Sequence, residues 1–453
     1  MEKMDILRNK FDKTYQSNHA NLATVLVITW IALLLIALLA ACGSNDDDAP
    51  MTDRFIFGRP PTLIAEADAP PCDFAAWSPY YNLRALCAEM VYDNVTPPEA
   101  VPALTSITFA EDGSLYMART AFGEIWALRD RDGDLFFDDL ARVAGGLTQP
   151  TGIAAHDGAL YVVSLDGITR LDDPDGDGIF DAQTPLVTDL PGAADGNFRA
   201  WPGSIAIGLD GRLYVSVRAA TSPSLRSTSP AATGLIARYA LDGSDKQIVA
   251  TGFNDPADFA WHPDTGDLWV VDSAATNSSE NEGTPPPDEL NRIAAATTPG
   301  SDYAAATPAF TFIDAQNRPA GVAFYTSDAI PFWSGDLLVA QRGSWNVPEP
   351  AGYAVMVVPF DEDANPVYPM DRVAPRDTYA RSYDAVSNLS LLGQGFYPYH
   401  PVDVAVSAEG WIYVALEEGR ILRFRPRPQD NVGIDFRQTS TAVMGLTATA
   451  EAQ

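Results

Sequence analysis

Two short acidic segments place a carboxylate at every second position, which is a spacing that suits a hard cation. Their carboxylates are Asp130, Asp132 and Asp134 in the first segment, and Asp173, Asp175, Asp177 and Asp181 in the second. Such an alternation wraps oxygen ligands around Ca²⁺, as in the first half of an EF-hand loop, where a glycine allows a sharp turn. The second segment has Gly178 at that position and the first has Leu135. The pattern predicts either two structural calcium sites or two solvated acidic turns.

The elements that carry these segments repeat along the chain. Ser204–Ser216 reads as two short strands of alternating apolar residues, joined at Asp210 and Gly211 by a tight turn that requires positive φ. The same pattern recurs at Thr108–Met117, Ile153–Val162, Phe259–Val270 and Val404–Val414, and more loosely at Gly321–Tyr325 with Gly335–Ala340. The turn glycines are Gly113, Gly158, Gly211, Gly266, Gly335 and Gly410.

Six copies of one hairpin predict an array of small sheets. Two more strands follow the hairpin within a unit, as at Leu235–Leu241 and Gln247–Thr251. Four antiparallel strands repeated six times are typical of an all-β, six-bladed β-propeller. We expect it to cover residues 102–437, with the first strand of each blade at the axis. The acidic segments begin 43 residues apart, so we expect them in equivalent loops of the first two blades.

The last blade, Val402–Phe424, lacks an evident outer strand. An open propeller would leave an unpaired edge at this point. We therefore expect closure either by Asn431–Arg437 or by a strand from before residue 103.

The first 42 residues resemble a bacterial lipoprotein signal. An apolar run, Leu22–Ala41, precedes Cys42, which is the residue that would carry the lipid. An uncleaved membrane anchor is the alternative, since about twenty apolar residues span a bilayer. Basic residues lie before the run and Asp46–Asp48 after it. Either way, the body of the protein is predicted to lie outside the cytoplasm, attached to the membrane.

The segment between this signal and the repeats, residues 43–101, reads as a tether followed by an extension. It contains Cys72 and Cys87, the only cysteines besides Cys42. In an exported chain these two thiols are predicted to form a disulfide. Residues 438–453 are predicted to be a disordered tail.

The chain is strongly acidic, with a formal net charge of −31 and a pI near 4.2. Such a charge argues against nucleic acid and against an anionic lipid surface as partners. It is compatible with calcium binding.

Residues 102–425 resemble the six-bladed, pyrroloquinoline-quinone (PQQ)-dependent sugar dehydrogenases, in particular the sorbosone dehydrogenase-like branch, which is related to soluble glucose dehydrogenase. The segments that carry the resemblance are Leu147–Ala154, Ile205–Val217, Ile248–Gly252, Phe259–Val270, Asp288–Ile293, Gly321–Tyr325, Gly343–Asn346, Gly352–Tyr353 and Val357–Phe360. The most specific is Gly343–Asn346 in the fifth unit.

The resemblance implies oxidation of a sugar or aldehyde, in which a histidine takes the hydroxyl proton and hydride passes to the quinone. This chain departs from the family at the positions that would do so. Ala200 stands where the base histidine is expected, and Gly203, Asn254 and Ala354 stand where cations are expected. No catalytic residue is therefore assigned.

Several residues remain as candidates to contact the cofactor. They are Arg199, Arg218, Arg342, Trp345 and Asn346. For Arg199 and Arg218, in the third unit, the alternative is that each is a solvated loop residue. For Trp345 the alternatives are stacking on a planar ligand and filling the space between two blades. Asp288 and Glu289 are expected either to bind calcium or to cap the start of a strand.

Two functions follow from these patterns. The first is a lipid-anchored PQQ-dependent dehydrogenase of the sorbosone or aldose type. The second is a propeller that has lost the chemistry and binds a sugar or a protein. Because the quinone carries three carboxylates that need Arg or Lys, we expect the apo protein not to retain it on dilution unless Arg199, Arg218 and Arg342 converge on one central pocket.

Overall fold

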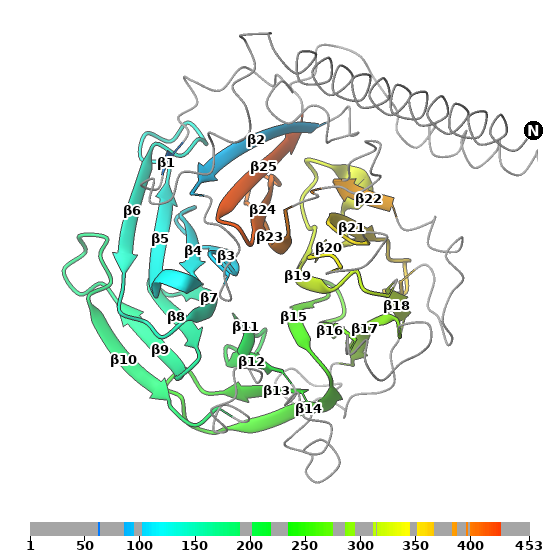
Figure 1. The fold of residues 1–453 in the computed structure, drawn as a ribbon, viewed down its shortest axis with the longest axis horizontal. Coiled ribbons are helices and arrows are strands. Elements are labelled where there is room, and N and C mark those ends of the chain that lie inside the picture. The colour runs from blue at the N-terminus through cyan, green and yellow to red at the C-terminus, as the bar shows by residue number, and fades with distance from the viewer. Residues whose placement is uncertain are drawn as a thin grey trace, which may run out of the picture. The chain divides into compact units, whose positions relative to one another are not determined.

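The computed structural model describes residues 62–63, 86–94, 102–190, 202–218, 234–274, 286–294, 311–313, 315–344, 351–366, 383–386, 396 and 399–426. All of them belong to the unit Phe57–Gln453. Within these ranges the chain forms six antiparallel sheets arranged around a centre (Figure 1). The predicted six-bladed β-propeller is confirmed.

The blades follow one another along the chain. Blades one and two contain β3 (Ser106–Phe109), β4 (Leu115–Arg119), β5 (Glu124–Arg129), β6 (Asp139–Ala144), β7 (Pro150–His156), β8 (Ala159–Ser164), β9 (Gly167–Asp172) and β10 (Ala182–Val187). Blades three and four contain β11 (Pro202–Ile207), β12 (Leu213–Val217), β13 (Gly234–Tyr239), β14 (Gln247–Phe253), β15 (Pro256–Trp261), β16 (Leu268–Asp272), β17 (Asp288–Ile293) and β18 (Thr311–Ile313). Blade five contains β19 (Pro319–Phe324), β20 (Leu337–Gln341), β21 (Ala354–Val358) and β22 (Tyr383–Val386), and blade six contains β23 (Pro401–Val406), β24 (Ile412–Leu416) and β25 (Arg420–Pro426).

The first strand of every blade lies innermost. In Figure 1, β3, β7, β11, β15, β19 and β23 surround the centre, and each contacts the first strand of the next blade. Each is joined to the second strand at its predicted glycine, and all six turn glycines have positive φ, between 69° at Gly266 and 92° at Gly335. The glycines with positive φ therefore lie in the turns of the hairpins, as the sequence predicts.

The apolar core lies between the blades. Tyr161 and Val163 of blade two pack with Val215 and Leu235 of blade three. Trp269 of blade four is fully buried in a cluster that includes Leu337 of blade five. Alternating side chains of neighbouring sheets fill these spaces, as the period of two predicts.

A strand from before residue 103 closes the ring, which is one of the two closures expected. β2 (Leu86–Asp93) pairs antiparallel with β25 along its whole length and supplies the fourth strand of blade six. β1 (Thr62–Leu63) pairs with β2 at the outer edge. Glu89 on β2 forms ion pairs with Arg423 at 2.6 Å and Arg425 at 2.7 Å. A strand from the N-terminal side of the blades thus pairs with the last strand among the described residues.

Loss of the Glu89 carboxylate should strongly destabilise this closure. The side chains of Glu89 and Arg423 are only 9% and 4% exposed, so Glu89→Ala would leave a buried guanidinium without its partner. Such a loss costs about 3–5 kcal/mol of unfolding free energy. Equilibrium urea unfolding measures it. Asp245→Ala is the matched control, because Asp245 is 53% exposed in its pair with Arg212 and exposed ion pairs contribute little to stability. Equal losses in the two variants would contradict the proposed role of the closure.

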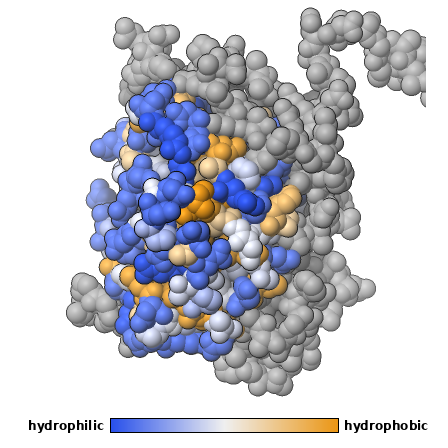
Figure 2. Space-filling view, turned by 90° about the vertical axis from the view of Figure 1, so that its left-hand side faces the viewer, coloured by the Kyte–Doolittle hydropathy of each residue, from blue (hydrophilic) through white to orange (hydrophobic). Residues whose placement is uncertain are grey.

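The face of the molecule shown in Figure 2 is mainly hydrophilic in its described part. In Figure 2 the coloured part of the surface is largely blue, with apolar residues in small groups. Large apolar side chains that are exposed are few within the described ranges: Phe122, Leu135, Ile179, Leu209 and Ile248. No helix in the described part of the chain is long and apolar enough to span a bilayer. Residues 1–42, with the expected signal, lie outside the described ranges.

Candidate functional site

The two ends of the propeller differ in chemistry. The first strands of blades two to six all begin with proline, namely Pro150, Pro202, Pro256, Pro319 and Pro401. We call the end that bears these prolines the proline face. The opposite end bears the six glycine turns, and we call it the turn face. On the proline face, residues just before each proline meet residues just after the second strand.

Arg218 and Arg342, two of the expected cations, both lie on the proline face. Each pairs with a carboxylate of the following blade. Arg218 Nε lies 2.6 Å from Asp255 Oδ1, and Arg342 donates two hydrogen bonds of 2.5 Å to Glu417. Burial raises the pKa of Glu417, but the charge and hydrogen bonds of Arg342, with smaller contributions from other nearby groups, together hold that pKa below its usual range. Both guanidinium groups are therefore partly neutralised.

Arg318, which the sequence analysis did not single out, lies beside them. The N–H of Arg342 donates to the carbonyl of Arg318 at 3.0 Å. Among the described residues the guanidinium of Arg318 forms no ion pair. Burial lowers its pKa, the positive charges of Arg342 and Arg218 lower it further, and the negative charges of Asp255 and Glu417 partly offset this lowering. The three arginines thus form one cluster in which Arg318 is the cation without a carboxylate partner in that part of the chain.

His400 lies next to this cluster on blade six. Its Nδ1 lies 2.5 Å from Glu418 Oε1, and its backbone N–H donates to Glu418 Oε2. The N–H of Glu417 donates to the His400 carbonyl at 2.8 Å, so the Arg342–Glu417 pair adjoins the imidazole. A carboxylate that accepts the Nδ1 proton leaves Nε2 as the basic nitrogen. His400 therefore has the arrangement of a general base with its orienting carboxylate.

Buried carboxylates hold the loops of this face in place. Asp288, at the start of β17, accepts hydrogen bonds from the N–H groups of Ala274 (2.7 Å) and Arg318 (2.8 Å). Asp272 accepts from Asn254 and Asp255. Burial raises the pKa of each carboxyl to about 7. Asp288 thus ties the segment after β16 to the residue before β19, and both roles expected for it, calcium binding and capping, stay predictions. Glu289 accepts a 3.4 Å hydrogen bond from Asn291.

A second pair of buried carboxylates lies on the first strands. Asp258 Oδ2 accepts the N–H of Val322, and Asp403 Oδ2 accepts the N–H of Ile107, in each case from the next blade. Burial raises the pKa of Asp258 to about 6, and burial and then the charge of Asp258 raise that of Asp403. They join neighbouring first strands near the centre.

The two acidic segments occupy equivalent loops, as predicted. Residues 130–138 connect β5 to β6, and residues 173–181 connect β9 to β10. In each loop the three leading carboxylates offer oxygens within 4.8 Å of one another. Gly178 has a φ of 88° and Leu135 has a φ of 75°. A leucine thus adopts the left-handed conformation that favours glycine. Asp181 is not part of the second cluster of close oxygens.

Several expected site residues cannot be placed. Arg199, Trp345 and Asn346 lie outside the described residues, as do Cys42 and Cys72. Cys87 belongs to β2, which is described by its backbone. Of the positions where family cations are missing, Gly203 lies on β11 and Ala354 begins β21. Asn254 donates to the carbonyl of Ser273 at 2.6 Å.

A sequence signal for Arg318 and His400 exists. Both stand immediately before the proline that opens a first strand, as does Asp255. Aligning the repeats on these prolines, instead of on the turn glycines, would have placed the three residues at equivalent positions of one ring.

Comparisons with known proteins agree with the fold. Residues 104–254 match the family model of a domain of unknown function (DUF7133), and residues 384–424 match the N-terminal part of strictosidine synthase-like proteins. None of the curated proteins compared with the chain matches it.

Solved structures resemble the chain over most of its length. An enzyme of Carbohydrate-Active Enzymes Family AA12 from Trichoderma reesei has a TM-score of 0.61 at 16% identity, covering 77% of this chain and 98% of the other. The PQQ domain of pyranose dehydrogenase from Coprinopsis cinerea has a TM-score of 0.55 at 14% identity, covering 76% and 97%. A glucose dehydrogenase has a TM-score of 0.50 at 15% identity, covering 73% and 99%. The structural neighbours thus include sugar dehydrogenases, and at these identities the likeness shows a shared fold.

Proposed function

We propose that the protein is an oxidoreductase that oxidises a sugar or aldehyde of the sorbosone or aldose type at its proline face, with PQQ as the cofactor. One observation carries the proposal: Arg318, which forms no ion pair within the described ranges, is close enough to Arg342 and Arg218 to feel their charges, and the Arg342–Glu417 pair adjoins the His400–Glu418 pair. The structural neighbours that are named as sugar dehydrogenases support it.

The charges of the proline face fit an anionic, planar cofactor. Arg342 and Arg218 lower the pKa of Arg318, so a carboxylate bound among the three arginines would relieve their repulsion. Guanidinium groups still have N–H donors after one ion pair, because each carries five. Arg218, Arg318 and Arg342 would therefore hold the quinone carboxylates. Since Asp255 and Glu417 already neutralise two of these arginines, we expect weak retention.

The chain's own residues supply proton transfer and orientation. When bound, the quinone supplies a two-electron acceptor for hydride. His400 Nε2, which is a buried atom, would take the proton of a substrate hydroxyl brought to it on this face. Glu418 holds the ring by its hydrogen bond to Nδ1 and stabilises the imidazolium that forms. The side chains of His400 and Glu418 are 13% and 9% exposed, and the low exposure strengthens this interaction.

Removing Arg318 should weaken cofactor binding. Purified apo protein is mixed with PQQ and Ca²⁺, and quinone binding and aldose oxidation with an artificial acceptor are both measured. We expect binding that is lost on dilution, and turnover at saturating quinone. Arg318→Ala should weaken quinone binding about tenfold or more, since a buried charge-assisted contact contributes about 1.5–3 kcal/mol.

Arg170→Ala is the matched control, because Arg170 pairs with Asp172 on the surface of blade two, and it should bind quinone like the wild type. Absence of turnover at saturating quinone would overturn the proposed oxidoreductase activity. It would favour the alternative, a propeller that has lost the chemistry and binds a sugar or protein. Ala200, which stands where the family's histidine is expected, supports that alternative.

The proposal includes an extracytoplasmic location, with lipid attached at Cys42 and a disulfide between Cys72 and Cys87. It also includes structural calcium in the acidic loops of blades one and two, which the clustering of their oxygens supports. A calcium structure of the Trichoderma reesei Family AA12 enzyme is among the structural neighbours.

A further inference from the structure

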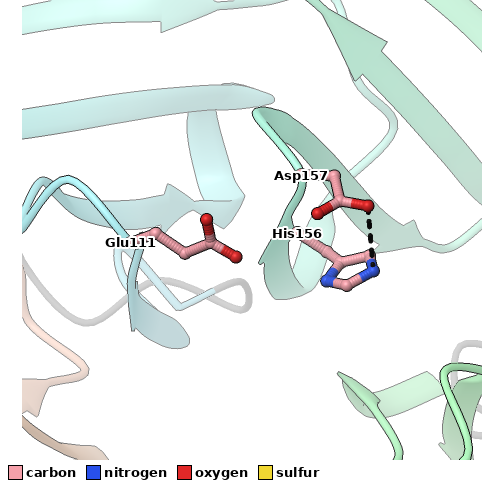
Figure 3. Close-up of side chains that lie close together, drawn as sticks. All are labelled: Glu111, His156 and Asp157. Atoms are coloured by element: carbon pink, nitrogen blue, oxygen red, sulfur yellow. Dashed lines mark ion pairs between the residues drawn. The ribbon is translucent and has the colours of Figure 1, made fainter.

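A second group of ligand-type side chains lies on the turn face, away from the arginine cluster. Glu111 belongs to the β3–β4 turn of blade one, His156 is the last residue of β7, and Asp157 belongs to the β7–β8 turn of blade two. Figure 3 shows the Glu111 carboxylate extending from its turn toward the pair on the neighbouring blade. One ligand atom of each residue lies within 4.8 Å of the others.

The repeat explains why these residues meet. Glu111 stands two residues before Gly113, and His156 stands two residues before Gly158, so they hold the same turn position in adjacent blades. The equivalent residues of blades three and six are Leu209 and Ala408, which are not metal ligands. Among these turns, blades one and two place a carboxylate and an imidazole side by side.

The spacing suits ligands of one small metal ion. His156 Nε2 lies 3.5 Å from Asp157 Oδ2, which is long for a hydrogen bond. Two ligands bound at about 2.0–2.2 Å in a tetrahedral site lie roughly 3.3–3.5 Å apart. The present distance therefore needs little adjustment for both atoms to coordinate the same ion, with Glu111 as a third ligand.

The charges of the group also favour a cation. Within the described part of the chain, neither Glu111 nor Asp157 forms an ion pair with arginine or lysine, although their carboxylates approach each other. His262, in the corresponding turn of blade four, differs: it is buried and its Nδ1 accepts the N–H of Asp264 at 3.2 Å. The His262 imidazole is thus occupied by a hydrogen bond within its own turn, whereas the His156 imidazole lies near two carboxylates.

We propose that Glu111, His156 and Asp157 bind one divalent transition-metal ion of the zinc class and thereby link the turns of blades one and two. An imidazole with two carboxylates suits Zn²⁺ or Cu²⁺, whereas Ca²⁺ takes oxygen ligands. Three protein ligands leave a coordination position for water. The site is independent of the chemistry proposed for the proline face.

Zinc titration of the metal-free protein tests this site. The full chain is purified without a histidine tag, stripped with a chelator and titrated calorimetrically with Zn²⁺ in excess Ca²⁺, which occupies oxygen-only sites. We expect one equivalent of Zn²⁺ to bind and the Tm to rise. His156→Asn and Glu111→Gln should each weaken binding about tenfold or more.

Glu409→Gln is the matched control, because Glu409 is an exposed glutamate in the equivalent turn of blade six, and its zinc affinity should equal that of the wild type. Cobalt absorption provides a second readout, since d–d bands of bound Co²⁺ should disappear in His156→Asn. Zinc binding that His156→Asn leaves unchanged, or no binding in the wild type, would overturn the proposal. Far-ultraviolet circular dichroism verifies that each variant is folded.

Discussion

Replacing His400 by alanine is expected to lower the kcat of sugar oxidation about 10²–10⁴-fold, which is the usual contribution of a positioned general base. Glu418 holds His400 Nδ1 at 2.5 Å, so Glu418→Gln should produce a smaller fall in kcat. The quinone affinity should change little in His400→Ala, because Arg218, Arg318 and Arg342 remain. Steady-state kinetics at saturating quinone measure kcat, and a separate titration measures the affinity.

The comparison of kcat with quinone affinity separates a catalytic role of His400 from a structural one. A structural role would lower the quinone affinity together with kcat in His400→Ala, whereas a catalytic role lowers kcat alone. Glu362→Gln is the control for the glutamate variant, because Glu362 lies exposed in the turn after β21. Wild-type kcat in His400→Ala would rule out the assignment of the base.

The second large expected effect is a dependence of the free energy of unfolding on pH. It arises from the buried carboxyl groups of Asp258 and Asp403. Because burial raises the folded-state pKa of Asp258 to about 6, the folded state holds a proton that the unfolded state releases near pH 4. The stabilisation that this proton gives the folded state is fully present below pH 4 and is lost as pH rises through 6. A shift of this size corresponds to about 2–3 kcal/mol of unfolding free energy.

Asp258→Asn should therefore flatten this decline. Urea unfolding at a series of pH values from 4 to 8 should show a smaller loss in the variant than in the wild type, with similar stabilities at pH 4. Asparagine keeps a side-chain oxygen that can accept the Val322 N–H, now at 2.7 Å from Asp258. Asp272 and Asp288 titrate in the same direction but are common to both proteins. Asp363→Asn, at an exposed loop position, should retain the wild-type slope. If the free energy of unfolding fell equally with pH in the wild type and in Asp258→Asn, the assignment of this decline to Asp258 would be contradicted.

These buried acids also suggest how the proline face keeps its form. Asp272 and Asp288 tie residues 254, 255, 274 and 318 together through backbone N–H groups. Asp258 and Asp403 join first strands of neighbouring blades. The arginine cluster therefore rests on hydrogen bonds to carboxyl groups, whose burial is tolerated because their oxygens are satisfied.

The sequence by itself determined the blades and the acidic loops, because both depend on local rules. A hairpin needs alternating apolar residues and a glycine with positive φ, and these are readable over about ten residues. The two acidic loops are likewise contiguous, so their equivalent positions followed from spacing alone. Closure was left with two alternatives, because an edge strand pairs through its backbone and several segments have suitable composition.

Only the tertiary structure decided what meets on the two faces. Arg318, Arg342, His400 and Glu417 are distant in sequence and become neighbours because the consecutive blades five and six pack side by side. The same packing of consecutive blades makes Asp255 and Glu417 the partners of Arg218 and Arg342, which were expected to bind a cofactor. Glu111 and His156 likewise meet only because neighbouring turns stand side by side. Long-range charge pairing depends on these relative positions, which no local pattern records, and it decides which cations remain available for a ligand.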